Sequence, residues 1–149
     1  MKILVLNCGS SSIKYKLFEM SNKEVQAQGG IEKIGLPGSF LKLTLPNGEK
    51  KIIEKDIPEH TAGVQFIFDT LTSAVYGAVK DLNEINAVGH RVVHGGTKFS
   101  GSVLIDDAVI AGIKECCDLG PLHNPANLKG IDAVLKLMPE VPQIAVFDK

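Results

Sequence analysis

Apolar and polar residues alternate in short runs over the first third of the chain, and these runs predict strands. Lys2–Asn7 is apolar and rich in branched side chains, and the small residues of Cys8–Ser12 then break regular structure. Ile13–Phe18 alternates apolar and polar residues, and Glu24–Ile31 is predicted as a further strand after the polar turn Ser21–Lys23. Three strands joined by tight connections predict an antiparallel meander.

Two further runs flank an Asn-Gly pair. Phe40–Leu45 and Lys51–Ile57 lie on either side of Asn47 and Gly48. Both residue types tolerate a positive φ, so the pair favours a hairpin with a two-residue turn. We expect a small hairpin insert on the surface, near residues 40–57.

The next segment changes to a helical period. Thr61 is a plausible N-cap, and the apolar positions that follow recur every three or four residues. These positions are Val64, Ile67, Phe68, Leu71, Val75 and Val79. The pattern predicts an amphipathic helix packed on the sheet.

The second half of the chain alternates strands with helices. Ile85–Val93 and Gln143–Phe147 are predicted strands, and Asp106–Cys117 and Asn124–Leu137 are predicted helices. The whole order predicts an α/β domain, in which a mixed sheet starts with the three-stranded meander and carries helices on its faces.

Composition limits the function classes. The 149 residues, 44% of them hydrophobic, suffice for one ordinary domain. Sixteen basic residues balance seventeen acidic ones without long runs, so neither nucleic acid nor an anionic membrane is an expected partner. The short apolar start is no signal peptide, and the odd cysteines Cys8, Cys116 and Cys117 match no disulfide or zinc pattern. A cytoplasmic protein with reduced thiols and a small-molecule ligand is predicted.

The turn within Asn7–Lys14 is the first candidate for chemistry. Its glycine and serines allow backbone N–H groups and hydroxyls to converge on an anion, and Lys14 adds a positive charge. The GxxxxGK[ST] spacing of a P-loop is absent, and the turn leads into a strand. An ordinary Ser/Gly hairpin loop with a solvated lysine explains the pattern equally well.

A second cluster places Arg91 between His90 and His94 at the end of an apolar strand. An arginine near a buried strand end usually pairs with a carboxylate or a phosphate, because an unpaired buried charge is costly. A structural ion pair remains the alternative, and either histidine could equally be structural.

The segment Gly120–Asn127 turns from a loop into a helix. Asn124 can cap that helix and Pro125 suits its first position, while the helix start favours an anion. Capping does not explain His123. Asp148 ends the last strand, where carboxylates commonly meet a ligand or metal, although an aspartate there could also cap a following helix.

Four segments in order, KILVLNCGSSSIKYKLF, GHRVVHGG, GPLHNPANLKGI and VFD, closely resemble the acetate kinase family. The resemblance spans essentially the whole chain, but members of this family are well over twice as long. It implies that residues 1–149 are the N-terminal domain of a two-domain kinase whose C-terminal domain is absent here. The implied fold is ribonuclease H-like, one half of an actin-like ATPase of the acetate and sugar kinase/Hsp70/actin superfamily.

The resemblance also implies an activity, the reversible transfer of a phosphoryl group from ATP to acetate with Mg²⁺, giving acetyl phosphate and ADP. On the phosphate side of the cleft, it implies that Asn7 lies near the metal. Ser10, Ser12 and Lys14 would contact the phosphates of ATP.

On the substrate side, the resemblance implies that Arg91 binds the carboxylate and steadies the phosphoryl group in transit. His123 would assist on the same phosphoryl oxygens. Val93 and Leu122 would line the methyl pocket, and Asp148 would be the essential acidic residue near magnesium.

The chain departs from the family at its end. Members usually continue VFD with Thr-Ala-Phe-His, whereas here Lys149 follows. The family's adenosine-binding region has no counterpart in this chain, so we expect these residues alone not to turn over. The full-length parent is expected to be a homodimer. A propionate or butyrate kinase and a non-catalytic phosphate-binding module remain alternatives.

Overall fold

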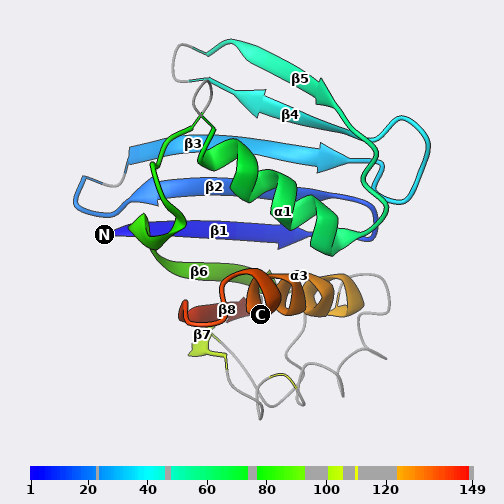
Figure 1. The fold of residues 1–149 in the computed structure, drawn as a ribbon. Coiled ribbons are helices and arrows are strands. Elements are labelled where there is room, and N and C mark those ends of the chain that lie inside the picture. The colour runs from blue at the N-terminus through cyan, green and yellow to red at the C-terminus, as the bar shows by residue number, and fades with distance from the viewer. Residues whose placement is uncertain are drawn as a thin grey trace.

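The computed structural model describes residues 1–22, 24–45, 48–73, 77–92, 101–105, 110 and 124–147. Eight strands form one mixed sheet in the order β5-β4-β3-β2-β1-β6-β8-β7 (Figure 1). The strands are β1 Lys2–Cys8, β2 Ile13–Glu19, β3 Glu24–Glu32, β4 Phe40–Thr44, β5 Lys50–Glu54, β6 Ile85–Val92, β7 Gly101–Leu104 and β8 Gln143–Phe147.

The first three strands form the predicted antiparallel meander. β2 pairs with β1 on one side and with β3 on the other. The alternation of β2 buries Ile13, Tyr15 and Leu17 on one face of the sheet, and exposes Lys14 and Lys16 on the opposite face. The polar positions of this strand therefore mark the face of the sheet away from the core.

The predicted hairpin forms, but it is not a separate surface insert. β4 pairs with β3, so β4 and β5 extend the central sheet, and Leu41 and Leu43 are buried in the main core. The expected two-residue turn is also wrong. The Leu45 N–H donates to the Glu49 carbonyl and the Gly48 N–H to the Leu45 carbonyl, which leaves three connecting residues with Gly48 at φ +88°.

Helix α1, His60–Leu71, starts and ends earlier than its sequence pattern suggests. Glu59 is the N-cap residue and makes no side-chain capping bond, so the prediction of Thr61 as N-cap is wrong. After Leu71 the chain folds back, and the N–H groups of Ala78 and Val79 donate to the Leu71 carbonyl. Val79 is therefore buried by this return and not by the helix.

The parallel part of the sheet follows the prediction closely. β6 pairs in parallel with both β1 and β8. Helix α3, Asn124–Leu137, has the predicted bounds. The predicted helix over residues 106–117 lies outside the described residues except at Ile110, which is helical. β7 was not predicted, and it pairs antiparallel with β8 at the edge of the sheet.

The two α-helices α1 and α3 lie on the same face of the sheet and pack against each other (Figure 1), and a short 3-10 helix, η1 Leu82–Glu84, precedes β6. Gly63 of α1 lies over Ile13 and Ile31 of the meander, and α3 contacts β1 and β6. The buried core lies between these helices and the sheet. In the described part of the chain, neither helix is long and apolar enough to cross a membrane.

Candidate functional site

The candidate site lies where the parallel strands β1 and β6 end. Leu6 of β1 pairs with His90 of β6, so Asn7 and Arg91, which come next, lie level with each other. The side chains of Leu6 and His90 face the core, and those of Asn7 and Arg91 are exposed on the opposite face. Carboxyl ends of parallel strands are where ligands commonly bind in α/β proteins.

The turn between β1 and β2 is fixed by three hydrogen bonds to its backbone carbonyls. The Gly9 N–H donates to the Ser12 carbonyl at 2.8 Å, and the Ile34 N–H donates to the Ser11 carbonyl at 2.9 Å. The His60 ring donates from Nε2 to the Gly9 carbonyl at 2.7 Å. These bonds engage the carbonyls of Gly9, Ser11 and Ser12 and the N–H group of Gly9.

The N–H groups of the three serines in the turn differ from that of Gly9. Within the described part of the chain, the backbone N–H groups of Ser10, Ser11 and Ser12 donate to no other residue. Successive unengaged N–H groups in a turn form an anion-binding concavity. The phosphate-binding role of the turn therefore stays a prediction, with an ordinary hairpin loop as the alternative.

Sequence reasoning missed His60. The residue is only 4% exposed, although it stands in the first turn of α1. Burial lowers the pKa of its imidazole, and the hydrogen bond to Gly9 partly opposes that shift. Its partner is 51 residues away in the chain, so no local pattern could have identified it.

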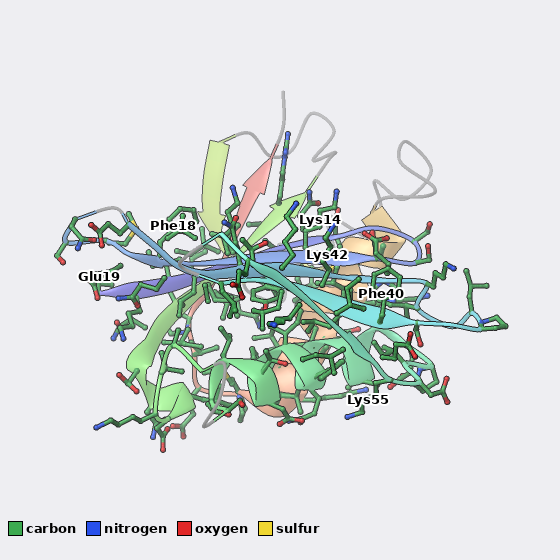
Figure 2. The ribbon with its side chains drawn as sticks, turned by 90° about the horizontal axis from the view of Figure 1, so that it is seen from above. Lys14, Phe18, Glu19, Phe40, Lys42 and Lys55 are labelled. Carbon is green, nitrogen blue, oxygen red and sulfur yellow. The ribbon has the colours of Figure 1, made fainter. Side chains whose placement is uncertain are left out.

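A depression of about 530 Å³ opens on the sheet face opposite the helices, and Asn7, Lys14 and Arg91 all line it. Figure 2 shows Lys14 and Lys42 extending from this face, whereas Lys55 lies on the helix side. Asn7 and Lys14 are direct cross-strand partners in the β1–β2 ladder. The structure thus brings three of the predicted residues together in one hollow.

Ser10 lies apart from those three. It lines a separate hollow of about 510 Å³ together with His60, Lys129, Asp132 and Lys136. Ser12 is partly buried, and its hydroxyl lies against Gly9. The turn therefore separates the two hollows, and the predicted phosphate-binding residues are divided between its two sides.

A hydrogen bond from helix α3 fixes the backbone of Arg91. Its side chain is exposed, so the burial cost expected from the sequence does not apply. Nδ2 of Asn127 in α3 donates to the Arg91 carbonyl at 2.9 Å and to the Cys8 carbonyl at 3.4 Å. This buried amide ties the ends of β6 and β1 to the helix, and the sequence did not single it out.

His90 is structural, one of the two interpretations that the sequence allowed. It is buried, and its Nε2 lies 2.6 Å from Oε1 of Gln143. Burial lowers the pKa of His90 to about 4, while the bond to Gln143 opposes the shift. The ring is therefore neutral at physiological pH, with Nε2 carrying the proton that the amide oxygen accepts.

Cys8 fills the space between β1 and α3. Burial raises the pKa of its thiol to about 12, so it is a protonated structural side chain and not a nucleophile. A Cβ added to Gly130 would stand 2.5 Å from the Cys8 Sγ. The helix reaches the strand this closely because residue 130 has no side chain.

Several predicted site residues lie outside the described residues: Val93, His94, Leu122, His123 and Asp148. Among the described residues, no group of three His, Cys, Asp or Glu side chains could hold a metal ion. Asn7 nevertheless presents an amide at the hollow beside Lys14. An amide oxygen next to a lysine that is predicted to bind phosphate suits Mg²⁺, which is bound by few protein oxygens together with phosphate and water.

Known proteins resemble this chain over its whole length. A model of the acetokinase family matches residues 2–149. The acetate kinase of Phocaeicola vulgatus is 72% identical over 148 residues, which cover 99% of this chain and 37% of that protein. The chain thus spans little more than a third of the length of the curated relatives it matches.

Solved structures agree with the sequence matches. The acetate kinase of Porphyromonas gingivalis superposes with a TM-score of 0.97 at 63% identity, covering 99% of this chain and 37% of that one. A propionate kinase from Francisella tularensis superposes with a TM-score of 0.88 at 37% identity, and the match covers 99% of this chain and 36% of that one. The expected ribonuclease H-like fold, one half of an actin-like ATPase, is confirmed by these neighbours and by the strand order. The chain belongs to the acetokinase family.

Proposed function

We propose that the complete protein containing this chain catalyses reversible, Mg²⁺-dependent phosphoryl transfer from ATP to acetate, giving acetyl phosphate and ADP. The observation that carries the proposal is the 72% identity to a protein named acetate kinase across 99% of this chain. Residues 1–149 then form the N-terminal domain of a two-domain kinase.

The geometry supports this reaction class. Phosphoryl transfer needs alignment and positive charge where negative charge develops, and little covalent chemistry from the protein. Arg91 and Lys14 line one hollow at the ends of β6 and β1. Acetate is already ionised at neutral pH, so its carboxylate can attack the γ-phosphorus without a general base. Arg91 binds that carboxylate, and the turn and Lys14 hold the phosphates.

Asn7, through its amide oxygen, and Asp148 would hold magnesium. His123 would assist at the phosphoryl oxygens. Bound there, the ion would neutralise charge on the phosphates of ATP. Val93 and Leu122 line the methyl pocket in this proposal. The adjacency of Asn7 and Lys14 across the β1–β2 ladder supports the placing of the metal next to the phosphates.

The test is acetyl phosphate formation by the complete protein from acetate and MgATP, trapped as the hydroxamate. We expect turnover that Arg91→Ala reduces by at least about a hundredfold, since one lost transition-state contact typically has that effect. Arg91→Lys should recover part of the loss. Absence of turnover by a folded, unmodified protein would refute the proposal, as would full activity in Arg91→Ala.

A second candidate acceptor is propionate. The similarity to the Francisella tularensis propionate kinase, with a TM-score of 0.88, favours it. One methylene in an apolar pocket changes selectivity by only about 10- to 200-fold, so a few pocket residues decide the preference. Competition among acetate, propionate and butyrate would identify the acceptor, and a higher kcat/KM for propionate or butyrate would replace acetate in the proposal.

The 149 residues alone are expected to bind ligand at most, because they span 37% of the relative's length. Acetyl phosphate formation by this segment alone would contradict that expectation. We also propose that the complete protein is cytoplasmic and forms a homodimer. The free, buried thiol of Cys8 supports the cytoplasmic assignment.

A further inference from the structure

Asn127 is a buried polar residue to which the proposed reaction gives no role. It stands near the start of α3 and is only 2% exposed. Its Nδ2 lies 2.9 Å from the Arg91 carbonyl oxygen and 3.4 Å from the Cys8 carbonyl oxygen. Hydrogen bonds of this kind are normally about 2.7 to 3.2 Å long, so the bond to Arg91 is the stronger of the two.

The amide of Asn127 lies where the ladder between β1 and β6 has ended. These strands pair only as far as Leu6 and His90, whereas the pairing of β6 with β8 continues beyond this point. Because the amide bonds the carbonyls of both Cys8 and Arg91, it spans the two strands after their own pairing stops. The backbone of Arg91 thus receives a hydrogen bond from a helix at the place where the ladder with β1 no longer continues.

Helix α3 is a rigid base for this amide. It packs against both β1 and β6, and Figure 1 shows it beside β6. Its residues Ala126 and Val134 are buried in the core, and Gly130 allows the helix to come close to Cys8. Groups on packed helices hold their positions more precisely than groups on loops. The donor of Asn127 is therefore well placed to fix a strand end.

The second polar atom of the amide has an unusual environment. Oδ1 of Asn127 is buried and has no hydrogen-bond partner in the part of the chain that the structure describes. Turning the amide over would place Oδ1 against two carbonyl oxygens, which also accept and do not donate. A buried acceptor without a donor lowers stability. A side chain that served packing alone would be apolar here, so the asparagine indicates a role beyond stability.

The position of the Arg91 backbone matters for the reaction. The side chain of Arg91 is exposed and lines the hollow on the sheet face opposite the helices. Where its guanidinium can reach is thus set by where the backbone is held. A displacement of about 1 Å in a group that aligns the substrates can lower the rate about a hundredfold.

We propose that Asn127 is a positioning residue for the carboxylate acceptor. Its amide holds the backbone of Arg91 so that the guanidinium presents the acceptor in line with the phosphoryl group. This inference rests on the proposed kinase function. Asn127 acts only through Arg91, whereas the bond from His60 to Gly9 fixes the turn between β1 and β2.

The test is steady-state kinetics of acetyl phosphate formation by the complete protein carrying Asn127→Ala, which removes the donor without adding charge. We expect kcat/KM for acetate to fall about tenfold to a hundredfold, because Arg91 is no longer held in position. KM for MgATP should stay within about twofold, because the groups that bind it are unchanged. Asn127→Ser, whose hydroxyl is too short to span the same distance, is a second variant and should show the same split.

Val134→Ala is the matched control for stability. Val134 lies about two turns further along α3 and is fully buried. Its truncation also destabilises the protein but leaves the amide of Asn127 in place, so kcat/KM for acetate should stay within about twofold. Urea denaturation of each variant establishes that it is folded under the assay conditions.

A double-variant cycle shows whether Asn127 acts through Arg91. In an Arg91→Ala background, Asn127→Ala should lower kcat/KM for acetate by no more than about a further twofold, because no guanidinium is left to position. An independent structural effect of Asn127→Ala would instead multiply the loss that Arg91→Ala causes.

Four results would overturn the inference: unchanged kcat/KM for acetate in both Asn127 variants, an equal loss in Val134→Ala, losses that multiply in the cycle, or a rise in KM for MgATP as large as the loss in kcat/KM for acetate. The last result would show that Asn127 acts on the turn through Cys8. Absence of acetyl phosphate formation by the unmodified protein would refute the proposed function, and this inference with it.

Discussion

Nε2 of His60 lies 2.7 Å from the carbonyl oxygen of Gly9, so the start of helix α1 is hydrogen-bonded to the turn between β1 and β2. We predict that His60→Ala loosens this turn and lowers kcat/KM for ATP by about ten- to a hundredfold, since small displacements of positioning groups have effects of this size. Steady-state kinetics of the complete protein with varied ATP measure it.

The conservative variant separates positioning from general destabilisation. Gln reaches about as far as His and keeps a donor, so His60→Gln should recover much of the activity that His60→Ala loses. Gln65→Ala, on the exposed side of the same helix, is the matched control. Equal losses in His60→Gln and His60→Ala would show that the hydrogen bond to Gly9 is not what matters.

Asn127 links two strand ends through one amide group, and its substitution should affect both stability and Arg91. Asn127→Asp has the same shape but places an acceptor against the carbonyls of Arg91 and Cys8. We expect a loss of about 2 to 3 kcal/mol in the free energy of unfolding, because one buried and one partly buried carbonyl lose their donor. Urea denaturation checks this. A loss no larger in Asn127→Asp than in Asn127→Ala would contradict the account.

The effects of substitutions at Gly130 and Cys8 on the free energy of unfolding should be strongly coupled. Gly130→Ala introduces a Cβ 2.5 Å from the Cys8 Sγ, and overpacking of this kind typically costs about 1 to 3 kcal/mol. Cys8→Ala removes the sulfur and leaves the nearest Cys8 atom, its Cβ, at 3.7 Å. The double variant should therefore be more stable than the sum of the two single losses predicts. Additive losses in urea denaturation would disprove the clash.

The neutral His90 makes stability depend on pH. Its pKa is about 4 in the folded protein against 6.5 ordinarily, so between these values the unfolded chain binds more protons. The contribution of neutral His90 to the free energy of unfolding is fully present above pH 6.5 and is lost as the pH falls toward 4. From pH 7 to pH 5 the loss is about 2 kcal/mol.

The measurement compares unfolding free energies of the unmodified protein and His90→Asn at the two pH values. Carboxylates titrate in both proteins, so the difference between their pH dependences isolates His90. The variant should lose less stability between pH 7 and pH 5. Identical pH dependences would show that His90 is not buried in its neutral form.

The sequence by itself determined most of the elements and their order. The alternation in Ile13–Phe18 and the apolar run of Ile85–Val93 predicted strands because burial on a sheet face selects a period of two or a continuous apolar run. The segment Asn7–Lys14 indicated either an anion-binding turn or an ordinary hairpin loop, since small residues and a lysine at a strand end suit both. Family resemblance then supplied the expected roles of Arg91 and Lys14.

Only the tertiary structure decided which distant residues are hydrogen-bonded to each other and which side chains line the same surface. The bonds from His60 to Gly9 and from Asn127 to Arg91 join residues 51 and 36 positions apart, and no local pattern encodes such pairs. Strand register placed Lys42 in line with Lys14 across Gly30, because cross-strand neighbours are set by sheet pairing and not by sequence distance. The chemistry of single residues can therefore be predicted from the sequence, whereas contacts between residues that are distant in the chain are seen only in the folded structure.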